Sequence, residues 1–461
     1  MSRHLRSHSK SKDEMPDVGT LNLSGNRSRS GSRSSSRLSS RSNSFGAVWM
    51  TAAQFLEYQE QPLANEETVY QPYTRTTTDV AAAANGNEEE MGQDSKTLIF
   101  ALIKQVKIGM DLSRVVLPTF ILEPKSMLEK VSDFLTHSEL LVATTRINDP
   151  LERMVGVVKW YLSGFYLKPK GVKKPYNPVL GELFRCSWNH PESKSFFIGE
   201  QVSHHPPVSA FYASNRKEGL VANGSILFRS KFYGTSVGSI LEGSITIHHI
   251  RFGEEYEVTF PSAYGKGFLF GTLVMELAGL VTITCKQSGL KAEIDFKQKP
   301  SFFGEYNTLQ GKISRLSNNQ PIFNLSGKWD QRIDLTDANN PKCGQILWAV
   351  TPEFINQKLT KLKPNPMFAL ESDALWSKVT DAIVAGDQQL ATDEKANIEQ
   401  AQRDAAAIRA EKNMGYTPRL FVPNSSGGWT YKWFNNKPWN PQEEDEEYEA
   451  AGIIATRKHR A

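Results

Sequence analysis

The middle of this chain, from residue 196 to about residue 337, alternates apolar and polar side chains with a period of two. Residues 256–260 read Tyr-Glu-Val-Thr-Phe, and residues 291–297 read Lys-Ala-Glu-Ile-Asp-Phe-Lys. Neighbouring side chains of a strand point to opposite faces, so this pattern predicts strands with one buried and one wet face. Many such segments in succession favour a large antiparallel sheet, closed or nearly closed into a barrel. A sandwich of two sheets fits the same pattern.

The composition is ordinary for a soluble globular protein, with 39% hydrophobic and 23% charged residues among 461. A net charge of +4 is too small to indicate a nucleic-acid partner. The three cysteines lack a Cys-x-x-Cys spacing, which argues against a disulfide framework and against a metal site. Residues 267–285 are long and apolar enough to consider as a membrane span, but Glu276 and the alternation after it predict two strands and a turn instead.

The N-terminal segment is rich in Ser, Arg, Asn and Gly, as in the run Arg-Ser-Arg-Ser-Gly-Ser-Arg at residues 27–33. Such a segment has too little apolar surface to offset the entropy lost on ordering, so we expect residues 1–93 to be disordered. Its basic first half fits two roles equally well. One is a phosphorylation-tunable tether to anionic membrane, and the other is a solubilising tail.

Order is expected to begin at residue 94, with a short amphipathic helix that is interrupted at Gly109. Its apolar positions are Leu98, Ile99, Leu102, Ile103 and Val106. Most helices of this kind simply cover a core.

Capping signals mark three further helices. Ser126 and Glu129 have the spacing of a capping box. Asp149 and Pro150 predict the N-cap and the first residue of a helix over residues 149–162. After residue 364 the apolar spacing becomes helical again, and Thr392 is the expected N-cap of the last helix.

Two adjacent histidines, His204 and His205, are followed directly by two prolines. Because proline lacks a backbone donor, we expect this pair at a strand end or a sheet edge. Imidazoles in such a place can donate hydrogen bonds to an anion, although most His-His pairs are ordinary surface residues. A second pair, His248 and His249, lacks the prolines and is expected to be structural.

Two other groups of polar residues have a regular spacing. Lys174 and Asn177 lie around a proline turn, which by itself is a common loop composition. Lys395, Glu399 and Arg403 fall at positions i, i+4 and i+8 on one helix face, where charge ladders usually form a solvated surface.

Taken together, these sequences resemble signature motifs of the oxysterol-binding-protein-related lipid-transfer family. The motifs are Glu-Gln-Val-Ser-His-His-Pro-Pro at residues 200–207, Lys-Lys-Pro-Tyr-Asn-Pro at residues 173–178 and Lys-x-x-x-Glu-x-x-x-Arg at residues 395–403. The resemblance covers roughly residues 95 to 440 and implies a mainly β (α+β) fold. In that fold a large antiparallel, nearly closed β-barrel surrounds an apolar lipid tunnel, with an N-terminal lid and helices and a C-terminal helical subdomain.

This resemblance also implies the domain boundaries. We expect a lipid-binding domain over residues 94–440, between the disordered segment 1–93 and an acidic then basic tail over residues 441–461. Within the domain the expected parts are a lid at 94–120, helices at 121–170, the barrel at 171–340, and C-terminal helices and tail at 370–440.

The resemblance further implies which residues hold the lipids. The phosphoinositide headgroup residues are Lys174, Asn177, His204, His205, Lys395, Glu399 and Arg403. Of these, Glu399 is expected to orient Lys395 and Arg403 rather than to touch phosphate. The lid and tunnel residues are Leu98, Leu102, Leu117, Thr119, Phe120 and Ile121. The implied phosphatidylserine headgroup site consists of Lys174, Asn177 and Ser236.

The cargo is inferred from the run Leu-Pro-Thr-Phe-Ile-Leu-Glu at residues 117–123, which looks like the version found in the phosphatidylserine-carrying branch. The resemblance then implies exchange of phosphatidylserine for phosphatidylinositol 4-phosphate between endoplasmic reticulum and plasma membrane. We expect a cytoplasmic monomer that contacts anionic membranes peripherally and needs no cofactor. Two alternatives are a sterol/phosphatidylinositol 4-phosphate exchanger and a lipid sensor without net transport. An enzyme is not expected, since the sequence has no His-Glu-x-x-His motif and no carboxylates at a telling spacing.

Overall fold

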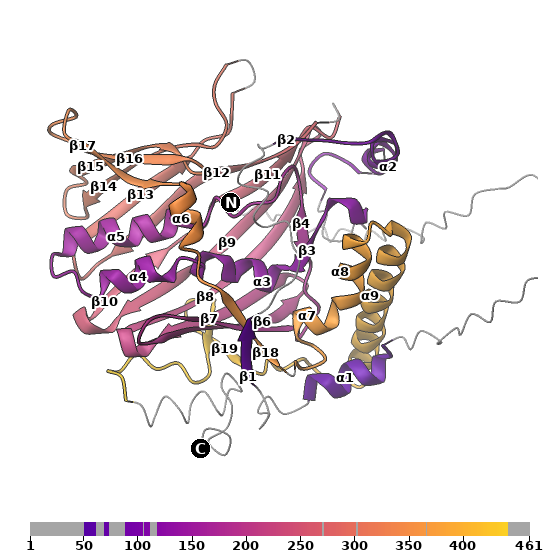
Figure 1. The fold of residues 1–461 in the computed structure, drawn as a ribbon. Coiled ribbons are helices and arrows are strands. Elements are labelled where there is room, and N and C mark those ends of the chain that lie inside the picture. Colours follow the sequence, from indigo (N-terminus) through magenta and orange to yellow (C-terminus); the bar gives the residue numbers. More distant parts are fainter. Residues whose placement is uncertain are drawn as a thin grey trace, which may run out of the picture. The chain divides into compact units, whose positions relative to one another are not determined.

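The structure is a computed structural model of the chain (Figure 1). It describes residues 50–60, 69–72, 88–104, 106–110, 118–269, 272–300, 303–365 and 367–440. The Ser/Arg-rich run near the N-terminus, the C-terminal tail after residue 440 and Leu117 lie outside the described residues.

One 16-stranded sheet organises the fold, and its strands pair antiparallel (Figure 1). In spatial order the main path is β1 (Val69–Pro72), β18 (Lys361–Asn365), β5 (Leu183–Asn189), β6 (Lys194–His204), β7 (Pro207–Asn215), β8 (Leu220–Phe232), β9 (Ser236–His249), β10 (Glu254–Val258), β12 (Thr272–Cys285), β13 (Leu290–Phe296), β14 (Thr308–Arg315), β15 (Pro321–Lys328), β16 (Arg332–Asp337) and β17 (Gly344–Ala349). Two further strands, β2 (Glu88–Glu90) and β11 (Ser262–Lys266), pair with β12. Among the described residues no ladder joins β1 to β17, which are the two ends of the strand order.

The strand between β9 and β12 is interrupted. β10 pairs with residues 245–249 of β9, and β11 pairs with residues 236–239. Between them, Pro261 has no N–H to donate, while the Thr259 carbonyl accepts the Tyr161 hydroxyl at 3.0 Å. The break therefore opens the ladder where a helix meets the sheet.

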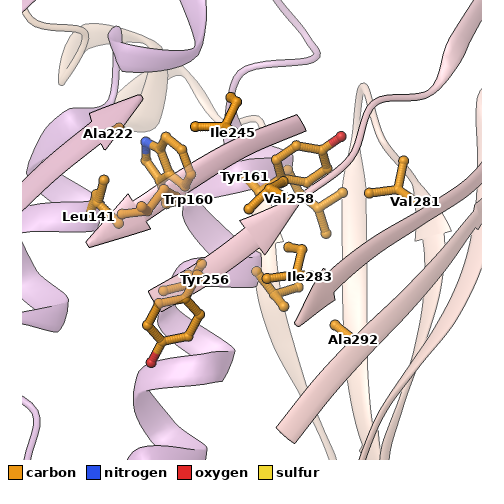
Figure 2. Close-up of a cluster of buried hydrophobic side chains, with 14 of the residues drawn as sticks. Leu141, Trp160, Tyr161, Ala222, Ile245, Tyr256, Val258, Val281, Ile283 and Ala292 are labelled. Atoms are coloured by element: carbon orange, nitrogen blue, oxygen red, sulfur yellow. The ribbon is translucent and has the colours of Figure 1, made fainter. Parts of the chain in front are cut away.

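Three helices pack on the face of the sheet that carries the main core (Figure 1). They are α3 (Met127–Ser132), α4 (Ser138–Thr144) and α5 (Pro150–Ser163). The Asp149 carboxylate accepts the backbone N–H groups of Leu151 and Glu152 at 2.8 and 2.9 Å, which confirms the predicted cap. Figure 2 shows Trp160 and Tyr161 of α5 among buried strand residues that include Ile245, Val258, Val281 and Ile283. The apolar stripe of α5 thus fills part of the sheet's inner face.

We predict that Ile283→Ala lowers the free energy of unfolding by about 2–5 kcal/mol, because the fully buried side chain leaves a cavity. Leu280→Ala on the same strand is the matched control, since Leu280 is 57% exposed. Urea unfolding should show a change below about 0.5 kcal/mol for the control. Equal effects of the two variants would contradict the assigned inner and outer faces of β12.

A second group of helices packs around α9 (Gln388–Glu411), at one side of the sheet (Figure 1). It contains α1 (Ala52–Glu60), α7 (Ser372–Leu375) and α8 (Ser377–Val384). Phe55 of α1 is fully buried in a cluster with Trp376 and with Ile398 and Ala401 of α9. The helix α1 therefore braces α9.

The remaining elements are short. They are α2 (Gln93–Ile103), α6 (Pro352–Asn356), the parallel pair β3 (Leu122–Ser126) and β4 (Lys174–Tyr176), the hairpin β19 (Phe421–Pro423) and β20 (Trp429–Tyr431), and the 3-10 turns η1 (Thr119–Ile121), η2 (Asp133–Leu135), η3 (Arg216–Glu218) and η4 (Ile250–Phe252). In the described part of the chain, no helix is both long and apolar enough to cross a membrane.

A buried ion-pair network joins α3 to β18. Lys363 contacts Glu129 at 3.0 Å and Asp373 at 2.7 Å, while Lys361 contacts Asp133 at 3.0 Å. Burial alone would raise the pKa of Glu129, but the lysines outweigh it and lower that pKa to about 2. Glu129 thus serves as a buried counterion, whereas Ser126 alone caps α3 through the Leu128 N–H.

Glu129→Gln should lower the free energy of unfolding by about 3 kcal/mol at pH 7, because it removes one partner of a buried pair. The folded pKa lies below the ordinary value of 4.5, so this stabilisation is present above pH 4.5 and is lost as the pH falls toward 2. The deficit should therefore shrink at pH 3 in denaturant titrations. Asp334→Asn, in an exposed pair with Arg332, is the control, and a pH-independent deficit for Glu129→Gln would contradict the argument.

The structure differs from the sequence-based expectation at the N-terminal side. Ordered elements begin at α1, ahead of residue 94, and include β1 and β2. These elements are three to nine residues long, so their order depends on distant partners: α1 packs on α9, and β1 pairs with β18. The first helix of the expected lid, α2, ends at Ile103, six residues before Gly109.

Three other boundaries also differ. Residues 272–285 form the single strand β12, and the turn falls at Gly267, where φ is +88°. The run of successive strands of the large sheet begins at β5, ahead of residue 196. The last helix begins at Gln388 because the Asp387 carboxylate accepts the Leu390 N–H at 2.9 Å. Thr392 lies inside the helix, where its hydroxyl donates to the Gln388 carbonyl.

Candidate functional site

The inner face of the sheet and the helices on it enclose a cavity of about 380 Å³. Its walls come from α2, η1, α5 and strands β8, β9, β11 and β12, and most of its lining is apolar. Apolar lining residues include Leu102, Ile121, Trp160, Phe228, Leu241, Phe260 and Met275. The charged lining residues are Glu123, Lys130, Asp133, Lys168, Lys173 and Lys174. A cavity of this size and lining suits hydrocarbon with a polar group at one place.

The residues expected in the lid and tunnel fall in different places. Leu102 and Ile121 line the cavity, whereas Leu98 is 43% exposed on another face of α2. Phe120 packs against the small cluster that contains Ile121. The buried Thr119 hydroxyl donates to the Gln388 side-chain oxygen at 2.5 Å, and this bond ties η1 to the first turn of α9.

The histidine pair occupies the tip of the β6–β7 hairpin. β6 ends at His204, β7 begins at Pro207, and the intervening His205–Pro206 peptide is cis. His204 Nδ1 lies 3.3 Å from His205 Nε2. His204 Nε2 lies 3.3 Å from the Asn177 amide nitrogen and 3.1 Å from that of Gln402 on α9. The hairpin, the loop after β4 and α9 therefore meet at His204.

Burial, together with the nearby charge of His205, lowers the pKa of His204 to about 4. The imidazole is consequently neutral at pH 7. In this state it offers one N–H donor and one acceptor, and permanent positive charge must come from lysine and arginine.

The cationic residues that the sequence predicts for this site are Lys174 and, on α9, Lys395 and Arg403. Lys174 lines the cavity, and Asn177, three residues later, lies 3.3 Å from His204. On α9, the Lys395 ammonium bonds Glu399 at 2.5 Å, as expected for an orienting carboxylate. Arg403 has a different partner and donates twice to the Gln400 side-chain oxygen, at 2.8 and 3.1 Å.

Ser236 lies apart from this group, at the first residue of β9. It pairs in the ladder with Lys266, and its neighbour Val237 lines the cavity. Residues 234–238 read Gly-Thr-Ser-Val-Gly, but they form the β8–β9 hairpin turn and the start of β9. A nucleophilic serine of the Gly-x-Ser-x-Gly type needs a strand-to-helix turn, so this serine is not placed for hydrolysis.

Two buried carboxylates hold the loops behind the histidine hairpin, and the sequence analysis did not single them out. Glu182 accepts hydrogen bonds from the Ser126 and Ser372 hydroxyls, the Trp376 indole and the Val179 N–H. Burial raises its pKa, although these four donors act in the opposite direction. The sequence signal that could have pointed to Glu182 is its position directly after Gly181, close to the Lys-Pro-Tyr-Asn-Pro motif.

Glu200 is the second buried carboxylate and opens the histidine motif itself. It accepts the Tyr416 hydroxyl and the backbone N–H groups of Arg419 and Leu420, at 2.7, 2.7 and 2.8 Å. Its role is to fasten the C-terminal tail to β6.

With this geometry established, the chain can be compared with known proteins. The family model for oxysterol-binding protein matches residues 101–449. The chain belongs to the oxysterol-binding protein family. This membership places it among lipid-binding and lipid-transfer proteins rather than among enzymes.

Three relatives illustrate the similarity. Human oxysterol-binding protein-related protein 8 is 46% identical over 381 residues, covering 81% of this chain and 42% of that protein. Human oxysterol-binding protein-related protein 5 is 43% identical and covers 81% and 43%. Oxysterol-binding protein 4 of Dictyostelium discoideum is 42% identical and covers 80% of each chain. The chain thus spans less than half the length of the two human relatives.

Two solved structures share the fold. The Osh1 ORD domain in complex with cholesterol has a TM-score of 0.64 at 21% identity, covering 88% of this chain and 97% of that one. The Osh3 ORD of Saccharomyces cerevisiae in complex with PI(4)P has a TM-score of 0.56 at 22% identity, covering 80% and 95%. The large antiparallel sheet with its helices is therefore the fold of this family.

Proposed function

We propose that this chain exchanges phosphatidylserine for phosphatidylinositol 4-phosphate between endoplasmic reticulum and plasma membrane. It acts as a monomer in the cytoplasm and touches each anionic membrane peripherally. The observation that carries the proposal is an apolar cavity whose lining includes Lys174, together with the meeting of Asn177, His204 and Gln402 three residues further along the same loop.

The apolar cavity addresses the main energetic obstacle to lipid transfer. At about 0.8 kcal/mol per CH₂, an acyl chain of roughly sixteen carbons resists entry into water by more than 10 kcal/mol. A largely apolar cavity lined by residues such as Leu102, Phe228 and Met275 replaces the bilayer interior during transfer. The protein supplies no chemistry, and the lipid gradients set the direction.

Lys174, Asn177, His204, His205, Lys395 and Arg403 form what we call the polar rim, and the rim would bind the headgroup. Charge-assisted hydrogen bonds to phosphate are stronger than neutral ones, and Lys174, Lys395 and Arg403 can provide them. Asn177 and His205 add further hydrogen-bond donors, and His204 contacts both of them. Since both lipids need the same cavity and the same rim, only one binds at a time, and competition between them produces exchange.

The choice of cargo rests on the sequence of residues 117–123, of which Thr119–Ile121 form η1. A sterol/phosphatidylinositol 4-phosphate exchanger is the second candidate, because Osh1 ORD domains of this fold have been solved with cholesterol and ergosterol. A lipid sensor would bind the same ligands stoichiometrically without moving them between vesicles.

The deciding experiment incubates the purified full chain with liposomes of mixed composition and identifies its bound lipid by native mass spectrometry. Phosphatidylserine and phosphatidylinositol 4-phosphate displacing one another at one-to-one would support the proposal. Bound sterol would favour the second candidate. Binding without transfer from donor to acceptor vesicles would favour the sensor.

We expect the double variant His204→Ala with His205→Ala to lose extraction of phosphatidylinositol 4-phosphate from vesicles by at least about tenfold, the cost of losing hydrogen bonds to a charged group. His205 is exposed, whereas His204 is partly buried and contacts Asn177 and Gln402, so a thermal melt of the double variant is needed to separate loss of binding from loss of fold. His248→Ala is a control histidine outside the rim, paired with Glu255. Unchanged extraction by the double variant would rule out the rim assignment.

Leu102→Asp should weaken phosphatidylserine uptake by at least about tenfold, because it places a charge on the cavity-lining face of α2. Leu98→Asp adds the same charge to an exposed face of the same helix and should leave uptake nearly unchanged. Fluorescent-lipid transfer between vesicles measures both. Equal loss in the two variants would show that the charge on α2, and not the cavity wall, is responsible.

A further inference from the structure

The side chain of Gln402 has an orientation that its neighbours determine. Gln402 lies on α9 and is only 7% exposed. One of its terminal atoms sits 2.7 Å from the backbone nitrogen of Leu180. A backbone N–H can only donate, so that atom must be the amide oxygen. The other terminal atom is then the NH₂ group, which lies 3.1 Å from Nε2 of His204.

This orientation assigns the proton positions on the histidine pair. Because the Gln402 NH₂ group can only donate, His204 Nε2 must accept and carries no proton. A neutral His204 then carries its proton on Nδ1, which lies 3.3 Å from Nε2 of His205. Nε2 of His205 accepts in turn, so the N–H of a neutral His205 is on Nδ1. His205 is exposed at the tip of the hairpin.

The loop that orients Gln402 is held from its other side by α1. The Gln59 amide donates to the Leu180 carbonyl at 2.6 Å, and the Gln59 oxygen accepts from Arg409 at 2.9 Å. Arg409 belongs to α9, as Gln402 does, so Leu180 is fixed between two helices. The hydrogen bonds therefore run in one direction, from α1 through Leu180 and Gln402 to His204 and His205.

We propose that Gln402 is a positioning residue of the rim: it fixes His204 as the tautomer protonated on Nδ1, so that His205 presents its Nδ1–H outward to a phosphate group. The phosphate part rests on the proposed function, whereas the tautomer assignment does not.

The charged groups around His204 leave this assignment in place at neutral pH. The charge that shifts the pKa of His204 is that of His205, while the contacts from the loop after β4 and from α9 come from the neutral amides of Asn177 and Gln402. Burial and His205 lower the pKa of His204 to about 4, so His204 should not titrate between pH 5 and pH 8.

The test is a ¹⁵N NMR spectrum of the histidine rings in the full chain, with His204 and His205 assigned by single His→Gln variants. At pH 7 we expect His204 to show a protonated Nδ1 and an unprotonated Nε2. In Gln402→Glu the bond to the Leu180 N–H is retained, but a carboxylate now faces His204. His204 should then become protonated on Nε2 and should titrate between pH 5 and pH 8. A purely structural role for Gln402 would not move the tautomer.

The functional arm uses vesicles that contain phosphatidylinositol 4-phosphate. Gln402→Glu should weaken binding by about tenfold at pH 7, as expected for the loss of a hydrogen bond to a charged group. Gln389→Glu adds the same charge to the same helix at an exposed site and should bind as the natural chain does.

Three results would overturn parts of the inference. A natural chain with His204 protonated on Nε2, or doubly protonated at pH 7, excludes the tautomer assignment. An altered tautomer in Gln402→Glu with unchanged vesicle binding excludes the positioning role. A natural chain that fails to bind these vesicles excludes the proposed function and with it the phosphate partner of His205, while the NMR result for Gln402 stands.

Discussion

Buried carboxylates hold together the loops on which the candidate site depends. An unpaired carboxylate in a protein interior costs several kcal/mol, whereas one that accepts several hydrogen bonds fixes each of its donors in place. Glu182 joins the start of α3, the loop after β4 and the helix α7. Glu200 fastens the C-terminal tail to β6. Since His204, Asn177 and Gln402 come from three separate elements, their contacts depend on these anchors.

The inner face of the sheet is divided between a packed core and a hollow. Where α5 lies on the strands, large side chains such as Trp160 fill the space and stabilise the fold (Figure 2). Toward α2 and η1 the wall remains apolar but encloses the cavity. Leaving that volume unfilled gives up packing energy that a continuous core would supply. A lipid chain in the cavity can restore those contacts, so the cost of the hollow and the affinity for cargo have the same origin.

The sequence predicted the parts of the fold that follow from local pattern. Alternation of period two marked most strands, and Asp149 with Pro150 marked the start of α5, because these signals act within a few residues. The predicted start of α9 at Thr392 was wrong. Asp and Thr are both good N-cap residues, so local sequence does not distinguish Asp387 from Thr392. β1 was missed because four residues pair with a strand almost 300 positions away.

For the site, the resemblance supplied the charged residues and histidines, and the structure brings several of them together. Gln402 was not found, because its role depends on one atom of Leu180, which is distant in sequence. Glu182 and Glu200 were missed for the same reason: a carboxylate next to a motif gives no sign of which donors will surround it. Contacts between remote segments are the part that pattern alone does not predict.

The short strand β1 has a consequence for how this sheet avoids self-association. Open sheet edges are templates for pairing with other chains, and short strands that end in proline are a common protection. β1 covers the backbone of β18 with four residues and ends at Pro72. A shortened chain beginning at residue 94 would leave β18 as an uncovered edge of five residues. Such a chain could keep its cavity and still become prone to aggregation through that edge.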